Sequence, residues 1–138
     1  MVKRIVLAAL AALVATAAFA ADPPKPAGLD AARKTFVATV KAKDWVKLAD
    51  QVNWPLKVDN YGSPPTLAKA AYLKDHKKLS IWLDDSLLGC IGGNAAAYQG
   101  DKTQFGFGNW IVDCNGNEFL FGVVGGKVLF TAYQNINE

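Results

Sequence analysis

The last third of the chain carries the clearest structural signal: Trp110–Gln134 reads WIVDCNGNEFLFGVVGGKVLFTAYQ. This stretch contains three short segments rich in aromatic and β-branched residues, which is typical of β-strands. The pairs Asn115-Gly116 and Gly125-Gly126 separate the segments, and both are tight-turn sequences that join antiparallel neighbours. We therefore predict a three-stranded antiparallel meander here, with a shorter fourth strand around residues 96–99.

The region before this meander has the periodicity of amphipathic helices. Apolar residues recur at three- and four-residue spacing in four segments: residues 28–42, a shorter segment that follows Asp44, residues 67–77 and residues 81–91. Asp44, Thr66 and Ser80 stand at the starts of the last three segments, where their side-chain oxygens can cap a helix. We expect Gly92-Gly93-Asn94 to end the fourth helix.

One short strand is expected between the second and third helices. Pro55 ends the second helix because proline lacks a backbone N–H. Leu56 and Val58 then form a strand that leads into the turn sequence Asn60-Tyr61-Gly62. Helices followed by a run of strands predict an α+β domain, with the helices packed on one face of an antiparallel sheet.

The first twenty residues have the order of a secretory signal peptide. Lys3 and Arg4 precede an apolar run from Ile5 to Ala15, and Ala18-Phe19-Ala20 is a small-residue cleavage site. The apolar run is short for a membrane span, so we expect cleavage and no stable membrane anchor afterwards. The expected organisation is a signal peptide at 1–20, a proline-rich leader at 21–27 and a single domain at 28–138, in a periplasmic or secreted protein.

The charge balance limits the classes of partner. The chain has 15 Lys and Arg residues against 12 Asp and Glu residues, a formal net charge of +3. Loss of Lys3 and Arg4 with the signal peptide lowers this charge to +1. A near-neutral domain without a basic stripe argues against nucleic acid as a partner. The partners that we expect are therefore a small molecule or another exported protein.

Cys90 and Cys114 are the two cysteines of the chain. Export brings them into an oxidising compartment, where a cysteine pair is expected to form a disulfide. The bridge would close a loop of about 25 residues and contribute roughly 3–4 kcal/mol in the chain-entropy description. A redox or metal site is the alternative, but the pair lacks CxxC spacing and a nearby histidine. We expect a structural disulfide and no metal site.

Short motifs along the chain occur in the order Phe36-x8-Trp45, Trp54-Pro55-Leu56-Lys57-Val58, Ile81-Trp82-Leu83, Phe105-Gly106-Phe107-Gly108-Asn109-Trp110-Ile111 and Asn135-Ile136-Asn137. This order resembles the cystatin-like, nuclear-transport-factor-2-like (SnoaL-like) superfamily of cone-shaped α+β domains, and more narrowly its small exported bacterial members. The resemblance extends over residues 30–138 and implies a curved sheet that encloses a conical pocket with its helices. The superfamily contains enzymes, binding domains and sheet-mediated homodimers, so the resemblance implies a fold, leaves homodimerisation open and specifies no reaction.

Four aromatic residues are the candidates for a ligand pocket: Tyr61, Trp82, Phe107 and Trp110. Tyrosine and tryptophan combine a large apolar ring with a polar atom, which suits small-molecule binding. If the cone is open, we expect these four side chains to share one cavity.

Asp113 is the one weak candidate for a catalytic group. Alternation along a strand from Phe105 puts Asp113 on the same face as Phe107, where burial would raise its pKa. The alternative, which we favour, is that Asp113 belongs to the hairpin beside Asn115. His76 lies among charged residues at a helix end and is expected on the surface. We expect no catalytic triad and no cofactor.

Three functions fit these observations. The first is an exported non-catalytic binding or accessory domain, with a small-ligand cone or a surface for another exported protein. The second is a periplasmic inhibitor or immunity protein against a secreted enzyme, with the glycine-rich segment 89–104 as its inhibitory loop. The third is an enzyme of the cone type that uses Asp113 or Asp85 as a base. No catalytic residue set of the superfamily can be matched here, which favours the non-catalytic functions.

Overall fold

The computed structural model describes residues 21–59, 65–103 and 106–137. The elements in chain order are α1 (Leu29–Lys41), α2 (Trp45–Ala49), β1 (Val52–Asp59), β2 (Thr66–Leu67), α3 (Lys69–Lys74), α4 (Lys77–Ser80), α5 (Asp85–Gly93), β3 (Ala97–Tyr98), β4 (Trp110–Cys114), β5 (Asn117–Val124) and β6 (Lys127–Asn135). The expected signal peptide at 1–20 lies outside the described residues. The architecture is α+β, as predicted from the order of helices and strands.

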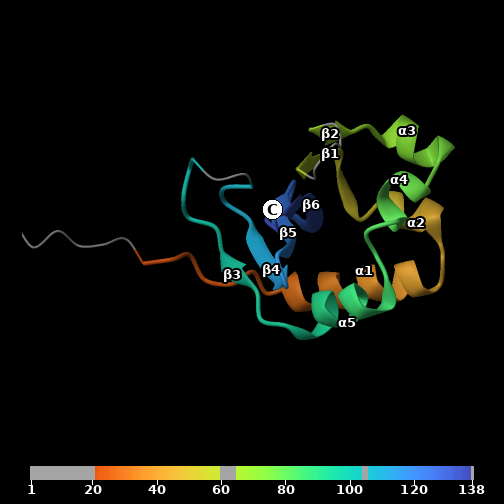
Figure 1. Ribbon diagram of the computed structural model, residues 1–138. Coiled ribbons are helices and arrows are strands. Elements are labelled where there is room, and N and C mark those ends of the chain that lie inside the picture. The colour runs from red at the N-terminus through yellow and green to blue at the C-terminus, as the bar shows by residue number, and fades with distance from the viewer. Residues whose placement is uncertain (1–20, 60–64, 104–105, 138) are drawn as a thin grey trace, which may run out of the picture.

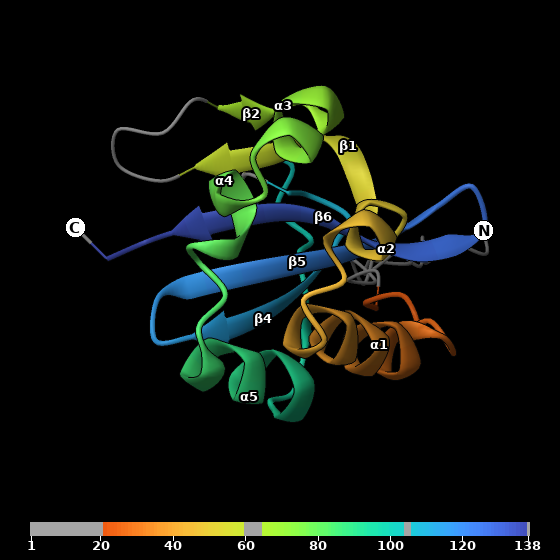
Figure 2. The same cartoon turned by 90° about the vertical axis from the view of Figure 1, so that its right-hand side faces the viewer.

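The strands form one six-stranded sheet in the order β2-β1-β6-β5-β4-β3, and the helices lie on one of its faces (Figures 1 and 2). β1 pairs with β6 in parallel, whereas the other neighbours are antiparallel. The sheet is therefore mixed, and the expectation of an antiparallel sheet was wrong at this one junction. The pairing of β1 with the last strand joins segments far apart in sequence, which local turn signals do not predict.

The β4–β5–β6 meander and its two turns are confirmed. Asn115 and Gly116 both have positive φ angles, of 54° and 82°, and so do Gly125 and Gly126, at 57° and 79°. Two successive residues with positive φ are the requirement of the two-residue hairpin turn that matches strand twist. The short fourth strand expected at 96–99 is also present, as β3 paired with β4.

The expected start of β4 at Phe105 was wrong, because β4 begins at Trp110. Gly106 and Gly108 have φ angles of 80° and 81°, in the left-handed region, so residues 106–109 form turns rather than a strand. A Cβ atom on Gly106 would lie 2.0 Å from the side chain of Leu120. Leu120 alternates with Phe119 and Phe121 along β5, so this loop packs on the sheet face opposite the helices.

Asn109 fastens the same loop to the sheet. Its side chain donates to the carbonyl oxygen of Gly106 and accepts a hydrogen bond of 2.8 Å from the Thr131 hydroxyl. The space for this side chain exists because residue 122 is glycine: a Cβ there would lie 2.1 Å from Asn109 Oδ1. Gly122 is thus a packing glycine in the interior of a strand.

The first helix matches its predicted position, and the second begins where predicted, because Asp44 caps α2 by accepting a hydrogen bond from the backbone N–H of Lys47. The prediction for Pro55 was wrong. The helix ends earlier, at Ala49, and Pro55 lies inside β1, which begins at Val52. Val52 pairs with Phe130 of β6, and this contact between distant segments starts the strand before Pro55.

The third and fourth predicted helices require correction. Thr66 is not a cap but part of β2, where it pairs with Lys57. Residues 67–77 do not form one helix, because Asp75 is extended, with φ −149° and ψ 94°, and separates α3 from α4. Ser80 does not open a helix either: α5 begins at Asp85, and the Asp84 carboxylate caps it by accepting from the N–H of Leu87.

Aromatic rings form the centre of the core between α1 and the sheet. Phe36 of α1 makes an edge contact with Phe121 at 5.6 Å and a tilted contact with Phe130 at 5.0 Å. All three side chains are buried. The predicted disulfide between Cys90 and Cys114 is present and joins α5 to β4 across a Cα–Cα distance of 5.9 Å.

Candidate functional site

A groove lies between the β1–β2 hairpin and the helices α3 and α4, and its volume is about 680 Å³. Its apolar lining, which we call the floor, consists of Val58, Leu67, Ala68, Ala71, Ile81 and Trp82, of which Val58 and Leu67 are buried and Ile81 is 74% exposed. Its polar lining residues are Thr66, Asp75, Lys77 and Lys78. We call this hollow the α3–α4 groove.

The local sequence explains why the groove is open. Ala68 and Ala71 have small side chains and lie where α3 begins beside the β1–β2 hairpin. Their methyl groups leave space between the helix and the hairpin. Asp75 then breaks the helix, and its carboxylate accepts a 3.1 Å hydrogen bond from the backbone N–H of Lys77 at the start of α4. The break turns the chain so that Lys77 and Lys78 line the groove beside the apolar floor.

Trp82 forms a rigid part of the groove. Its ring stacks on Tyr133 of β6 at 4.8 Å with an interplanar angle of 9°. Tyr133 is buried, and its hydroxyl donates a 2.8 Å hydrogen bond to Asn117. Because Tyr133 is fixed in the sheet and the Trp82 ring stacks on it, the indole is preorganised for contact with a ligand.

The helix α3 is anchored behind the groove by Tyr72. Its hydroxyl donates a 2.7 Å hydrogen bond to the carbonyl oxygen of Trp45, and its ring lies 5.1 Å from that of Trp54. The half-buried His76, expected on the surface, stacks on Trp45 at 4.7 Å. Burial, with a smaller contribution from the Asp44 charge, raises the pKa of Tyr72 to about 12.

Alkaline pH is expected to destabilise the fold through Tyr72. Because its pKa is higher in the folded than in the unfolded chain, the stabilisation is complete below pH 10 and is lost as the pH rises through about 12. The ionisation of Tyr72 alone should make the free energy of unfolding about 2 kcal/mol lower at pH 11.5 than at pH 9. Urea unfolding at both pH values measures the difference. Tyr72→Phe is the control, and an unchanged pH dependence in that variant would contradict the assignment.

Of the four aromatic candidates, the structure brings Trp82 to the groove. Tyr61 lies outside the described residues. Phe107 is 42% exposed on the loop before β4 and lines a different hollow, with Lys102 Nζ 5.8 Å from its ring centre. Trp110 lies in β4, where its ring packs 5.6 Å from that of Tyr98. The expected shared cavity is therefore not formed by Trp82, Phe107 and Trp110.

Asp113 belongs to the β4–β5 hairpin. Its side chain is exposed, and its carboxylate accepts a 2.8 Å hydrogen bond from the backbone N–H of Gly116. The hairpin alternative, favoured from the sequence, is thus the one that the structure shows. Asp113 does not line the α3–α4 groove.

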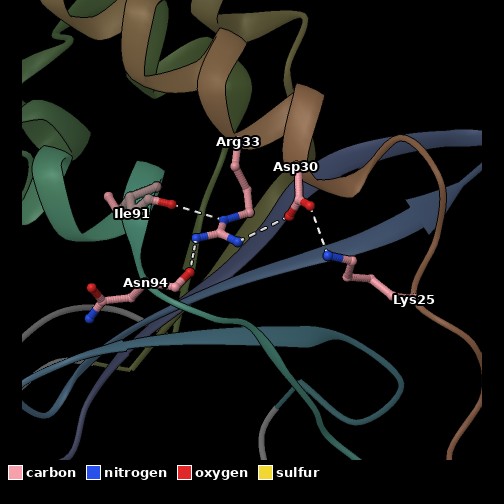
Figure 3. A network of polar contacts seen from close by, with 5 residues as sticks. All are labelled: Lys25, Asp30, Arg33, Ile91 and Asn94. Atoms are coloured by element: carbon pink, nitrogen blue, oxygen red, sulfur yellow. Dashed lines mark hydrogen bonds and ion pairs between the residues drawn. The ribbon is translucent and has the colours of Figure 1, made fainter.

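A buried arginine connects α1 to the end of α5 (Figure 3). The Arg33 guanidinium donates to the carbonyl oxygens of Ile91, at 2.8 Å, and Asn94, and forms an ion pair with Asp30 at 3.4 Å. Burial lowers the pKa of Arg33, which the Asp30 charge opposes. Asp30 also pairs with Lys25 at 2.7 Å, and this hydrogen bond lowers the pKa of Asp30.

Sequence reasoning missed Arg33 and the groove lysines. The signal for Arg33 was present, because it falls on the buried stripe of α1 with Leu29, Phe36 and Val40. No comparable signal marked Lys77 and Lys78, since they were placed at the end of one continuous helix. Their position follows from the break at Asp75.

In the described parts of the chain, no cluster of three or more His, Cys, Asp or Glu side chains could hold a metal ion. No helix in the same residues is long and apolar enough to cross a membrane. The chain matches no protein-family model, no curated protein and no solved structure.

Proposed function

We propose that this protein is an exported, non-catalytic binding domain whose α3–α4 groove holds a small, largely apolar molecule. The observation that carries the proposal is the apolar floor of six residues in a groove of about 680 Å³. Cavities that bind small molecules are mostly apolar and measure about 300–1,000 Å³. Trp82, held against Tyr133, supplies a flat ring on which such a ligand can pack.

Binding fits the groove chemistry better than catalysis does. Asp75 is the carboxylate among the described lining residues, and one of its two oxygens accepts a hydrogen bond from the backbone of α4. Acid–base catalysis needs a positioned partner for such a group, and the described lining residues include no second carboxylate and no histidine. His76 stacks on Trp45 and does not line the groove.

The location and the fold family belong to the same proposal. Residues 1–20 have the order of a signal peptide, and the Cys90–Cys114 bridge suits an oxidising compartment such as the periplasm. A mixed sheet with helices on one face is compatible with the cystatin-like cone, in which the α3–α4 groove would be one opening. Sequencing the N-terminus of the protein recovered from the periplasm would test the cleavage after Ala20.

A groove-filling substitution tests the binding proposal. The full chain is expressed with its own leader, and the oxidised protein is titrated with the uncharged fluorophore N-phenyl-1-naphthylamine. Ala71→Phe places a ring in the groove and should weaken binding about tenfold or more, whereas Ala70→Phe is the matched control. Ala70 is exposed on the same helix and does not line the groove. If the fluorophore shows no saturable binding, or if folded Ala71→Phe binds like the parent protein, the proposal fails.

A further inference from the structure

The polar residues of the α3–α4 groove carry an uneven charge. Lys77 and Lys78 both line the groove, and both side chains are exposed. The ion pairs formed within the described residues involve other cations: Lys25, Arg33 and Lys69. Two lysine charges beside the apolar floor are therefore without a carboxylate partner in that part of the chain.

Asp75 does not neutralise this pair of charges. It is the single carboxylate against two lysines among the described lining residues, and its oxygen accepts from the N–H of Lys77. A carboxylate held by backbone hydrogen bonds at a helix start is fixed in place by them. The net charge around the opening is positive, while the floor between Leu67 and Trp82 is apolar.

We infer that the natural ligand is an amphipathic anion, with an apolar tail on the groove floor and a carboxylate or phosphate head group at Lys77 and Lys78. This inference rests on the proposed binding function and names the class of ligand. An anionic head group would be attracted by both lysine charges, an uncharged one would gain nothing from them, and a cation would be repelled. A hollow of about 680 Å³ is sized for one small molecule, which favours a monomeric amphiphile over a membrane surface.

Three probes that share a ten-carbon chain and differ in head group test the ligand class. Decanoate, decan-1-ol and decyltrimethylammonium, each below its aggregation concentration, compete with N-phenyl-1-naphthylamine for the full oxidised protein. Decanoate should bind about five- to tenfold more tightly than decan-1-ol, and the cation most weakly. Because both lysines are exposed, the preference for decanoate should shrink in high salt.

The double substitution Lys77→Gln/Lys78→Gln should abolish the preference for decanoate, so that the ratio of the decanoate and decan-1-ol affinities measured in the same variant falls to about one. Lys74→Gln is the matched control, because Lys74 is an exposed lysine of α3 that does not line the groove. Equal affinity for decanoate and decan-1-ol, or a preference that survives the double substitution, would overturn the anion inference while the groove remains a binding site. Absence of fluorophore binding would instead overturn the proposed function itself. Lysine-dependent binding to phosphatidylglycerol vesicles without displacement by monomeric decanoate would overturn the inference in favour of a membrane surface.

Discussion

Removal of the Cys90–Cys114 bridge is expected to lower the free energy of unfolding by roughly 3–4 kcal/mol. The bridge spans 24 positions and joins the end of α5 to the end of β4. Because it closes a loop of about 25 residues in the unfolded chain, opening it adds many conformations to that state. The loss is a large part of the roughly 5–15 kcal/mol that stabilises a domain of this size.

Urea unfolding of the oxidised protein and of Cys90→Ala/Cys114→Ala measures this effect. The reduced parent protein is the matched control, since it opens the same loop and keeps both sulfur atoms. Cys114 is buried, so the alanine variant should lose slightly more stability than reduction alone. Equal unfolding midpoints for the oxidised and reduced proteins would show that the bridge does not constrain the fold.

Arg33→Met is expected to lower the free energy of unfolding by about 2–3 kcal/mol, because it leaves the buried carbonyl oxygen of Ile91 without its hydrogen-bond donor. The variant keeps the aliphatic stem but removes the donors that hold the carbonyl oxygens of Ile91 and Asn94 at the end of α5. These carbonyls belong to the helix end, where no backbone N–H of the next turn can satisfy them. The contact between α1 and α5 should therefore loosen.

Lys34→Met is the control for Arg33→Met. Lys34 is the next residue of α1, it is exposed, and the same substitution there should change stability by less than about 0.5 kcal/mol. The stability loss of Arg33→Lys should lie between those of Arg33→Met and Lys34→Met, because one ammonium group cannot reproduce the planar array of donors of a guanidinium. If Arg33→Met unfolds at the same urea concentration as Lys34→Met, the contacts of Arg33 between α1 and α5 do not stabilise the fold.

Local signals predicted the parts of the fold that depend on neighbouring residues. Asn115-Gly116 and Gly125-Gly126 specify their turns through backbone conformations that few residues adopt, so the meander followed directly. Asp44 was recognised as a helix cap because its side-chain oxygen can accept a hydrogen bond from a backbone N–H in the first turn. The pairing of β1 with β6 depends instead on contacts between residues 52–59 and 130–134, which no short window contains.

Errors arose where one pattern suits two structures. Alternating phenylalanine and glycine before Trp110 has the period of a strand, but the positive φ angles of Gly106 and Gly108 make it a turn. Threonine is common both as a helix cap and in strands, and Thr66 lies in a strand because it pairs with Lys57 of β1. The apolar spacing of 67–77 continued through Asp75, whose extended backbone divides the helix.

The candidate site was predicted only in part. Trp82 was identified because a large aromatic ring is informative in any fold. Lys77 and Lys78 could not be distinguished from the other surface lysines, because their position depends on the break between α3 and α4. Ala68 and Ala71 were not singled out from the sequence either, although both line the groove.

The most direct measurement of groove binding is a nitrogen-15 NMR titration of the oxidised protein with N-phenyl-1-naphthylamine. We expect saturable shift changes concentrated in β1, β2, α3 and α4, together with the indole N–H of Trp82. The hairpin around Asp113 and the loop around Phe107 should remain unchanged. Shifts confined to that loop, or spread without saturation over the exposed valines of the β5–β6 turn, would contradict the α3–α4 groove as the binding site.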